Sequence, residues 1–210
     1  MTVLTVALVL VGSYLVGGIP FSYLAGAWKG IDLREHGSGN LGASNTYRIL
    51  GGKIALAVLV LDIAKGCIPV LVASAWDVPG NEPVHELAAA VGAVLGHLFS
   101  PYLRFSGGKG IATSAGAFAA LAPWAFLFAF AVFVMVFAAR KIVSLASLSA
   151  AVTLPIAVYL TEHYGLAAAS RDVIGASILV MLVVIWKHRG NIKRLVAGTE
   201  PRLARKRDTA

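Results

Sequence analysis

Long runs of mostly apolar residues, separated by short polar segments, repeat along the whole chain. They cover residues 2–27, 54–76, 84–100, 110–139, 143–161 and 172–186. Roughly 20 residues of helix cross the hydrocarbon layer of a membrane, whereas the strands of a membrane β-barrel would read as shorter segments of alternating polarity. With 58% hydrophobic and only 13% charged residues, the 210-residue chain is also more apolar than a soluble protein. These features predict an all-α integral membrane protein.

The run 110–139 decides the predicted number of transmembrane helices. As one helix, it would place Arg140 and Lys141 on the opposite side of the membrane from Lys109. As two helices separated at Pro123, it keeps these residues on one side, which agrees with the excess of Lys and Arg in cytoplasmic loops. We therefore expect seven transmembrane helices, with the N-terminus outside and the C-terminus in the cytoplasm.

This arrangement places sixteen of the eighteen Lys and Arg residues on the cytoplasmic side, the exceptions being Lys65 and Arg171. The net charge of +8 therefore needs no nucleic acid partner. The basic tail, about 187–210, is instead suited to anionic lipid headgroups, at about 1 kcal/mol per basic residue near the surface. We predict one membrane-embedded domain over residues 1–210. Cys67 is the only cysteine and no His, Asp and Glu cluster has metal-ligand spacing, so neither a metal nor a cofactor is expected.

Three polar segments fall at the cytoplasmic ends of the predicted helices, and the first runs from Gly37 to Arg48. Its glycines allow backbone N–H groups to approach an anion, and the Arg48 guanidinium is a forked donor for phosphate. A flexible polar loop is the alternative interpretation. The candidate phosphate-binding residues here are Ser38, Gly39, Asn40, Ser44, Asn45 and Arg48.

The second polar segment ends in Gly107, Gly108 and Lys109, directly before a predicted short helix at about 110–122. A helix of about 13 residues is roughly 20 Å long and too short to cross the hydrocarbon layer comfortably, so its N-terminus should lie at depth. Free N–H groups at such a helix start favour an anion. The segment therefore predicts a phosphate or carboxylate pocket. It is not a Walker A loop, because Gly110 stands where that motif requires Ser or Thr.

The third polar segment, Lys187 to Arg194, contains His188 and Asn191, which would share one face if the last helix continued. Orientation in the membrane explains the cations of this segment but not these two residues. Ser147 lies at the start of the sixth span, where it is either a site residue or a serine used for helix capping and packing.

Charged residues inside the second apolar run point to a structural pair. Asp62 and Lys65 have the i,i+3 spacing that lets them neutralise each other, so we expect a pair that tethers the site. A direct functional role is the alternative, because charges inside a membrane are costly and often mark function. His97 reads as an isolated histidine without metal-ligand partners.

Several segments, in this order, resemble the bacterial acylphosphate:glycerol-3-phosphate acyltransferases, the PlsY family. They are Ile19-Pro20-Phe21-Ser22, Gly37 to Arg48, Asp62-Ile63-Ala64-Lys65-Gly66, Gly96 to Thr113 and His188-Arg189-Gly190-Asn191. The resemblance implies a seven-helix enzyme of the bacterial inner membrane with a cytoplasmic site. It implies transfer of a fatty acyl group from acyl phosphate to the sn-1 hydroxyl of glycerol 3-phosphate, in the first step of phospholipid synthesis. A functional link to a soluble enzyme that forms the acyl phosphate is also implied.

The chemistry of that reaction suits these residues. Acyl phosphate is an activated mixed anhydride, so the protein mainly aligns the hydroxyl with the carbonyl and stabilises negative charge. No G-x-S-x-G motif or His-x4-Asp signature is present, so no covalent acyl-enzyme is expected. By resemblance, the donor phosphate accepts the hydroxyl proton, and His188 is the alternative base.

The predicted site residues divide between the two substrates. The expected catalytic residues are Ser38, Arg48, Lys109, His188 and Asn191, of which the last four hold glycerol 3-phosphate. Those expected around the acyl phosphate are Ser38, Gly39, Asn40, Ser44, Asn45, Gly107 and Gly108, while Ser147 can serve either substrate.

Two other classes of function stay open. A small anion transporter would also place glycine-rich helix ends and cations around a phosphate, although no internal repeat is detectable. A non-catalytic membrane scaffold would leave the three polar segments unexplained.

Overall fold

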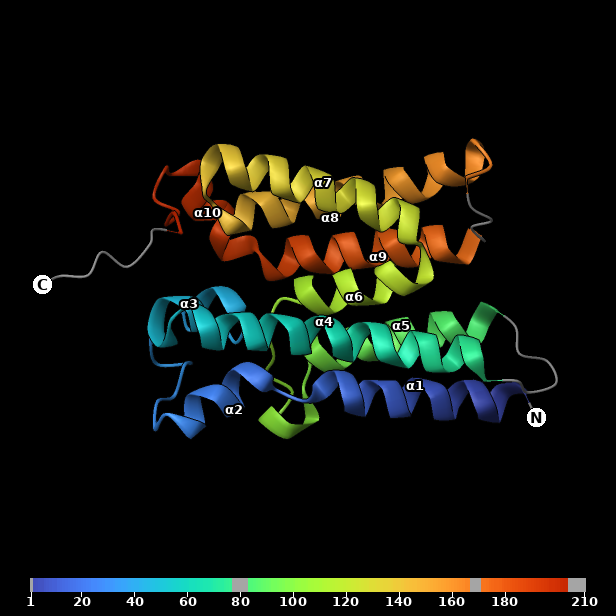
Figure 1. Cartoon of the computed structure of the whole chain (residues 1–210), viewed down its shortest axis with the longest axis horizontal. Coiled ribbons are helices and arrows are strands. Elements are labelled where there is room, and N and C mark those ends of the chain that lie inside the picture. The colour runs from blue at the N-terminus through green and yellow to red at the C-terminus, as the bar shows by residue number, and fades with distance from the viewer. Residues whose placement is uncertain (1, 77–82, 167–170, 204–210) are drawn as a thin grey trace, which may run out of the picture.

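The computed structural model describes residues 2–76, 83–166 and 171–203, which form helices and no strands (Figure 1). The helices are α1 (Thr2–Gly18), α2 (Phe21–Trp28), α3 (Ala43–Leu50), α4 (Gly52–Ala75), α5 (Pro83–Leu98), α6 (Ile111–Leu121), α7 (Pro123–Arg140), α8 (Val143–His163), α9 (Arg171–Lys187) and α10 (Arg189–Val196), with a short 3-10 helix η1 (Pro101–Leu103).

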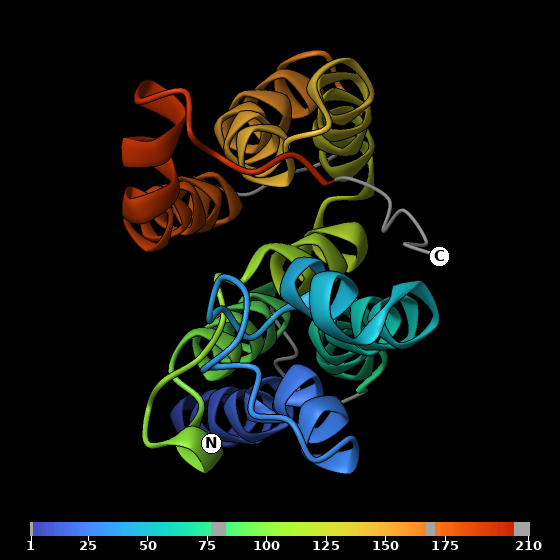
Figure 2. The same cartoon turned by 90° about the vertical axis from the view of Figure 1, so that its left-hand side faces the viewer.

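Two groups of long helices lie on either side of α6. Helices α1, α4 and α5 form one group, and α7, α8 and α9 form the other (Figures 1 and 2). Helix α6 contacts α4 and α5 in the first group and α7 and α9 in the second. The short helices α2, α3 and α10 all lie at one end of the molecule, opposite the start of α1 (Figure 1).

Helices α4 and α6 approach closely because glycines stand where they meet. A Cβ added to Gly66 would overlap the Thr113 carbonyl, and one added to Gly116 would overlap the Ile63 carbonyl. Small residues at such crossings let backbones pack directly in membrane proteins. This contact fixes the start of α6 against the middle of α4.

Large apolar side chains cover the outside of the helices, as in a protein surrounded by lipid. More than half of each side chain is exposed at Leu71, Phe128 and Leu182. Among the described residues, the segments long and apolar enough to cross a membrane are Val3–Trp28, Gly52–Ala75, Val84–Leu103, Pro123–Arg140 and Val143–His163. Helices α9 and α10 add a sixth if this pair, bent by 62°, counts as one span. Helix α6 is apolar but shorter.

The predicted break in the run 110–139 is confirmed, because α6 ends at Leu121 and α7 begins at Pro123. Proline suits the first position of a helix, where its missing N–H is not needed. The first apolar run contains a break that we did not predict, since α1 ends at Gly18 and α2 begins at Phe21. Pro20 has no N–H and disfavours helical geometry in the residue before it, which accounts for the interruption.

Two polar segments also differ from their predicted form. The second half of the first segment is not a loop but the helix α3. In the third segment the helix does not continue straight, because the chain bends at His188, between α9 and α10. Contrary to the prediction, His188 and Asn191 therefore do not share one face of a continued helix. Both side chains are nevertheless buried and line the same cavity.

Candidate active site

A cavity of about 760 Å³ is lined by residues of both helix groups. Leu59, Asp62 and Ile63 of α4 line it from the first group, and α7, α8 and α9 line it from the second. The polar side chains come from parts of the chain that are far apart in sequence. They are Ser38, Asn40, Ser44, Asn45, Arg48, Asp62, His97, Lys109, Ser114, Ser144, Ser147, His188, Asn191, Arg194 and Glu200.

The first polar segment is folded around the amide of Asn45, which is completely buried. Its Oδ1 accepts hydrogen bonds from the backbone N–H and the hydroxyl of Ser38, at 2.9 and 3.2 Å. Its Nδ2 donates to the carbonyls of Leu33 and His36, at 3.0 and 3.1 Å. Asn45 therefore holds the loop that presents Ser38, and each atom of its amide group is engaged within the protein.

The second and third polar segments meet at Lys109, whose ammonium donates a hydrogen bond to Oδ1 of Asn191. Nδ2 of Asn191 donates in turn to Oε1 of Glu200 at 2.6 Å. The same carboxylate accepts from the Ser144 hydroxyl at 2.6 Å and from Nε of Arg194 at 2.7 Å. Glu200 thus links α8, α10 and the residues after α10 beside the cations of the cavity.

The protonation states of this network follow from burial and neighbouring charge. Burial lowers the pKa of Lys109 to about 8; the Glu200 carboxylate opposes this effect, while Arg194 and Arg48 add to it. Lys109 is therefore mainly charged at pH 7. Burial alone would raise the pKa of Glu200, but the hydrogen bonds that it accepts hold its pKa below the ordinary value.

His188 directly follows α9 and is almost completely buried. Nδ1 lies 2.8 Å from the Val184 carbonyl, which can only accept a hydrogen bond, so the proton of the neutral ring is on Nδ1. Burial and the nearby Lys109 charge lower the pKa of His188 to about 4. The imidazole is consequently neutral at pH 7, and Nε2 is left as a hydrogen-bond acceptor.

The glycines of the second segment are tightly packed. A Cβ at Gly107 would overlap the His97 carbonyl, and one at Gly108 would overlap the His97 ring. The N–H of Gly108 donates to the His97 carbonyl at 3.2 Å. After these residues, α6 begins directly beside the cavity, with Ile111, Ala112 and Ser114 among its lining residues.

An apolar part of the cavity continues from the polar residues. It is lined by Phe118, Phe126, Ala129, Phe130, Phe133, Ala150, Ala151, Leu154, Val180 and Val184. At 1.5 Å per residue, the distance along α8 from Ser144 to Leu154 is roughly 15 Å. Phe118 and Leu154 also belong to a packed core cluster with Val158. The cavity can therefore hold a polar group and a long apolar chain together.

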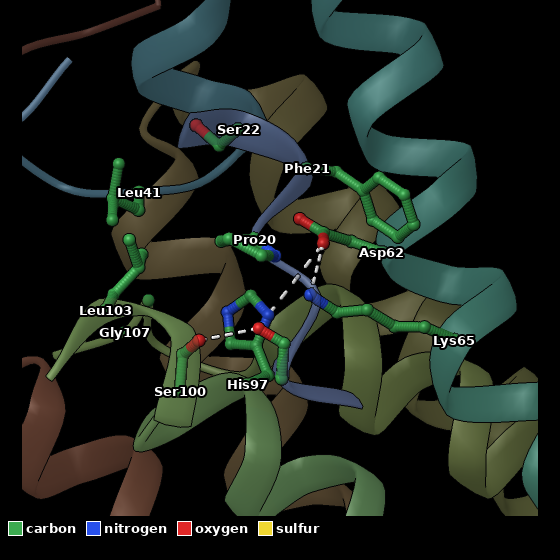
Figure 3. A pocket seen from close by; sticks show the side chains of 12 residues that line it. Pro20, Phe21, Ser22, Leu41, Asp62, Lys65, His97, Ser100, Leu103 and Gly107 are labelled. Atoms are coloured by element: carbon green, nitrogen blue, oxygen red, sulfur yellow. Dashed lines mark hydrogen bonds and ion pairs between the residues drawn. The ribbon is translucent and has the colours of Figure 1, made fainter. Parts of the chain in front are cut away.

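Nine of the twelve residues predicted for the site line this cavity: Ser38, Asn40, Ser44, Asn45, Arg48, Lys109, Ser147, His188 and Asn191. Gly39, Gly107 and Gly108 are not among its lining residues; the last two line a much smaller pocket beside it (Figure 3). In the described part of the chain, no three His, Cys, Asp or Glu side chains gather as a metal site would require.

Sequence reasoning missed Glu200 and took His97 for an isolated histidine. Glu200 is the only acidic residue between Lys187 and Arg207, a signal that was available in the sequence. His97 in fact lies beside Asp62 and lines the cavity. The predicted Asp62–Lys65 pair is confirmed, with Oδ1 and Nζ 2.7 Å apart.

Comparison with known proteins agrees with these features. Residues 7–198 match the model of the glycerol-3-phosphate acyltransferase family. The chain is 44% identical over 189 residues to a glycerol-3-phosphate acyltransferase of Trichlorobacter lovleyi, covering 90% of this chain and 93% of that protein. It is 41% identical over 205 residues to a glycerol-3-phosphate acyltransferase of Desulforamulus reducens, covering 97% and 98%.

Two similar crystal structures are of PlsY (YgiH), an integral membrane glycerol 3-phosphate acyltransferase. Its glycerol 3-phosphate form matches with a TM-score of 0.85 and 34% identity, and its lysophosphatidic acid form with a TM-score of 0.82 and 33% identity. Each comparison covers 94% of both chains.

Proposed function

This chain belongs to the glycerol-3-phosphate acyltransferase family, and from this premise we propose that it transfers a fatty acyl group from acyl phosphate to the sn-1 hydroxyl of glycerol 3-phosphate. The products are 1-acyl-glycerol 3-phosphate and inorganic phosphate. The observation that carries the proposal is one cavity in which cationic, amide and hydroxyl side chains adjoin an apolar part. One substrate is small and anionic, and the other has an anionic head and an apolar tail.

Glycerol 3-phosphate is held by Arg48 and Lys109, with Asn191 and His188 beside them. Asn191 supports this assignment because it bonds the Lys109 ammonium and is itself fixed by Glu200. The acceptor phosphate replaces part of the solvation that Lys109 loses on burial. Charge-assisted hydrogen bonds to phosphate are about twice as strong as those between neutral groups.

The acyl phosphate head lies near Ser38, Asn40 and Ser44, with its chain in the apolar part of the cavity. Gly39 does not line the cavity, and its positive φ of 66° instead forms the turn that presents its two neighbours. Asn45 acts here through the loop, because its amide holds Ser38. The packing of Gly107 and Gly108 against His97 likewise supports a role in shaping the start of α6. Ser147, which is buried and lines the cavity, is near enough to the polar residues to contact either substrate.

The reaction proceeds by direct transfer between the two bound substrates. The sn-1 oxygen forms a bond with the acyl carbonyl carbon, and the bond from that carbon to the phosphate oxygen breaks. The proton of the hydroxyl passes to the departing phosphate. Nε2 of His188 accepts a hydrogen bond from the hydroxyl and orients it, but a pKa of about 4 makes the imidazole a weak proton acceptor at pH 7. Lys109 stabilises the negative charge that develops on the carbonyl oxygen. The Ser38 hydroxyl donates to Asn45 in the free protein, and it assists only by turning from Asn45 to the carbonyl oxygen.

The proposed setting is the bacterial inner membrane, with seven spans and the site on the cytoplasmic side. Helices α1, α4, α5, α6, α7, α8 and α9 succeed one another in alternating direction along the molecule, which supports seven passes with α6 as a short one (Figure 1). A soluble enzyme that forms acyl phosphate supplies the donor.

Single cysteines test this orientation in a Cys67→Ala background. An impermeant thiol reagent added outside intact cells is expected to label a cysteine at Pro123 but not one at Arg140, because these positions begin and end α7. Labelling of both positions, or of Arg140 alone, contradicts the proposed orientation.

A vesicle experiment separates acyl transfer from anion transport. Purified protein in sealed lipid vesicles is given labelled glycerol 3-phosphate outside, with and without acyl phosphate. We expect labelled 1-acyl-glycerol 3-phosphate and equimolar phosphate only when the acyl phosphate is present. Accumulation of unmodified label inside the vesicles, without acylated product, would instead identify a transporter.

A further inference from the structure

A buried cluster of charged and polar side chains lies between α4 and the end of α5. Asp62, Lys65 and His97 are each less than a tenth exposed, and they line a small pocket together with Ser100 (Figure 3). Burying charged groups in a membrane protein is costly, so such groups are retained where they have a definite task.

Part of that task is to hold the break between α1 and α2. Nζ of Lys65 donates a hydrogen bond to the Ile19 carbonyl at 2.8 Å, and the Ser100 hydroxyl donates to the Gly18 carbonyl at 2.6 Å. Because α1 ends at Gly18, the carbonyls at this helix end have no partners in a following helical turn, and these side chains supply donors for them. This part of the cluster is a structural tether.

His97 does not take part in that tether. Its Nδ1 is 3.8 Å from Oδ1 of Asp62 (Figure 3). The other edge of its ring, with Nε2 and Cε1, faces Gly108. The His97 carbonyl also accepts the N–H of Gly108 at 3.2 Å. The residue that precedes Lys109 is thus held by both the backbone and the ring of His97.

Gly108 lies between the His97 ring and the first polar segment. A Cβ on Gly108 would overlap the His97 ring and come within 2.5 Å of the Leu41 carbonyl. Leu41 stands two residues before α3, which carries Arg48. The thickness of this stack, His97 then Gly108 then Leu41, therefore sets the separation of the segments that carry Lys109 and Arg48.

We propose that His97, supported by the Asp62–Lys65 pair, is a positioning residue that fixes Lys109 relative to Arg48 and so preorganises the acceptor phosphate site. This inference rests on the proposed function, in which both cations bind the phosphate of glycerol 3-phosphate. Two cations bind one phosphate well only at a fixed separation, and displacements of about 1 Å can cost a hundredfold in rate.

A double-mutant cycle tests the stack. His97→Ala loosens it and Gly108→Ala overfills it, so each variant is expected to raise KM for glycerol 3-phosphate by roughly tenfold or more. KM for acyl phosphate should rise by a smaller factor, because only the Leu41 side of the stack adjoins the acyl phosphate residues. In the double variant the new methyl group enters space that the ring has left. The fold increase in its KM for glycerol 3-phosphate is therefore expected to lie well below the product of the increases in the two single variants.

Ser100→Ala is the matched control, because it breaks the tether to Gly18 without touching Gly108. It should lower the thermal unfolding midpoint and leave KM for glycerol 3-phosphate near that of the parent. If His97→Ala does not fold, His97→Val takes its place in the cycle, because valine fills more of the site than alanine but lacks the ring atoms that face Gly108.

Three results would overturn the positioning role if the parent protein is active. The first is that the effects of the two substitutions on KM for glycerol 3-phosphate simply multiply in the double variant. The second is an equal rise in KM for both substrates, and the third is a rise in KM for glycerol 3-phosphate in Ser100→Ala as large as that in His97→Ala. A parent that forms no 1-acyl-glycerol 3-phosphate contradicts the proposed function instead, so the two failures are distinguishable in one assay.

Discussion

Deprotonation of Lys109 should limit the use of glycerol 3-phosphate at alkaline pH. Burial lowers the pKa of this ammonium to about 8 in the free protein. The charged form, which attracts the acceptor phosphate, is present below that pH and is lost as the pH rises through it. From pH 7 to pH 9, the charged fraction falls from about nine-tenths to about one-tenth. We therefore expect kcat/KM for glycerol 3-phosphate to fall roughly tenfold over this interval.

The assay measures initial rates of 1-acyl-glycerol 3-phosphate formation from pH 7 to pH 10 at saturating acyl phosphate. The acceptor phosphate, whose second pKa is about 6, stays ionised throughout, so it does not contribute to the alkaline limb. The pH dependence of kcat/KM reports pKa values in the free protein, and that of kcat reports pKa values in the substrate complex. Bound phosphate stabilises the Lys109 charge, so the alkaline fall in kcat should lie at higher pH than that in kcat/KM.

Substitution of charged residues near Lys109 should shift the alkaline limb of the pH profile in either direction. Glu200 raises the pKa of Lys109 and Arg194 lowers it, so Glu200→Gln should shift the limb to lower pH and Arg194→Gln to higher pH. Lys109→Arg, which stays charged beyond pH 12, should flatten the profile whatever its absolute activity. A profile that is flat in the parent, or an unchanged limb in Lys109→Arg, would refute this explanation.

Three further predictions concern the two substrates. Arg48→Ala should remove about 3 kcal/mol of transition-state stabilisation, or roughly a hundredfold in kcat/KM, without a change in the unfolding midpoint; the exposed Lys53→Ala is the matched control, and a parent-like rate in Arg48→Ala contradicts its role. Phe118→Ala and Leu154→Ala should extend the range of acyl chains used, and Ala150→Phe should shorten it, because these residues line the apolar part of the cavity; a series of acyl phosphates of graded length checks this, and an unchanged preference in all three variants would argue against chain binding there. Protein exposed to acyl phosphate alone should show no mass increase, whereas a stoichiometric acyl adduct on Ser38, Ser44 or Ser147 would replace direct transfer with a two-step route.

Local rules predicted most of the helices but not all of their interruptions. Pro123 begins α7 as expected, and Pro20 divides the first run. Pro69 and Pro155 instead lie inside uninterrupted helices. Membrane helices tolerate proline where neighbouring groups satisfy the backbone. Whether a given proline ends a helix thus depends on contacts that the local sequence does not contain.

The candidate site shows the same limit. Residue types identified the three polar segments, because their glycine, amide and histidine residues are not explained by orientation in the membrane, unlike the cations beside them. The partner of Lys109 is Asn191, which lies 82 residues further along the chain, and no local pattern joins them. Asn45 was expected to contact substrate, yet its amide is engaged in holding the Ser38 loop. Whether a polar side chain contacts substrate or holds a neighbouring segment depends on the tertiary fold.

A comparison of acyl donors most directly tests the central claim that one cavity brings acyl phosphate and glycerol 3-phosphate together. Purified protein is supplied with glycerol 3-phosphate and either acyl phosphate or the matching acyl-CoA, and 1-acyl-glycerol 3-phosphate is measured by mass spectrometry. We predict product with acyl phosphate, one phosphate released per acyl group transferred, and no product with acyl-CoA. Comparable product from acyl-CoA alone, or none from acyl phosphate, would contradict the account.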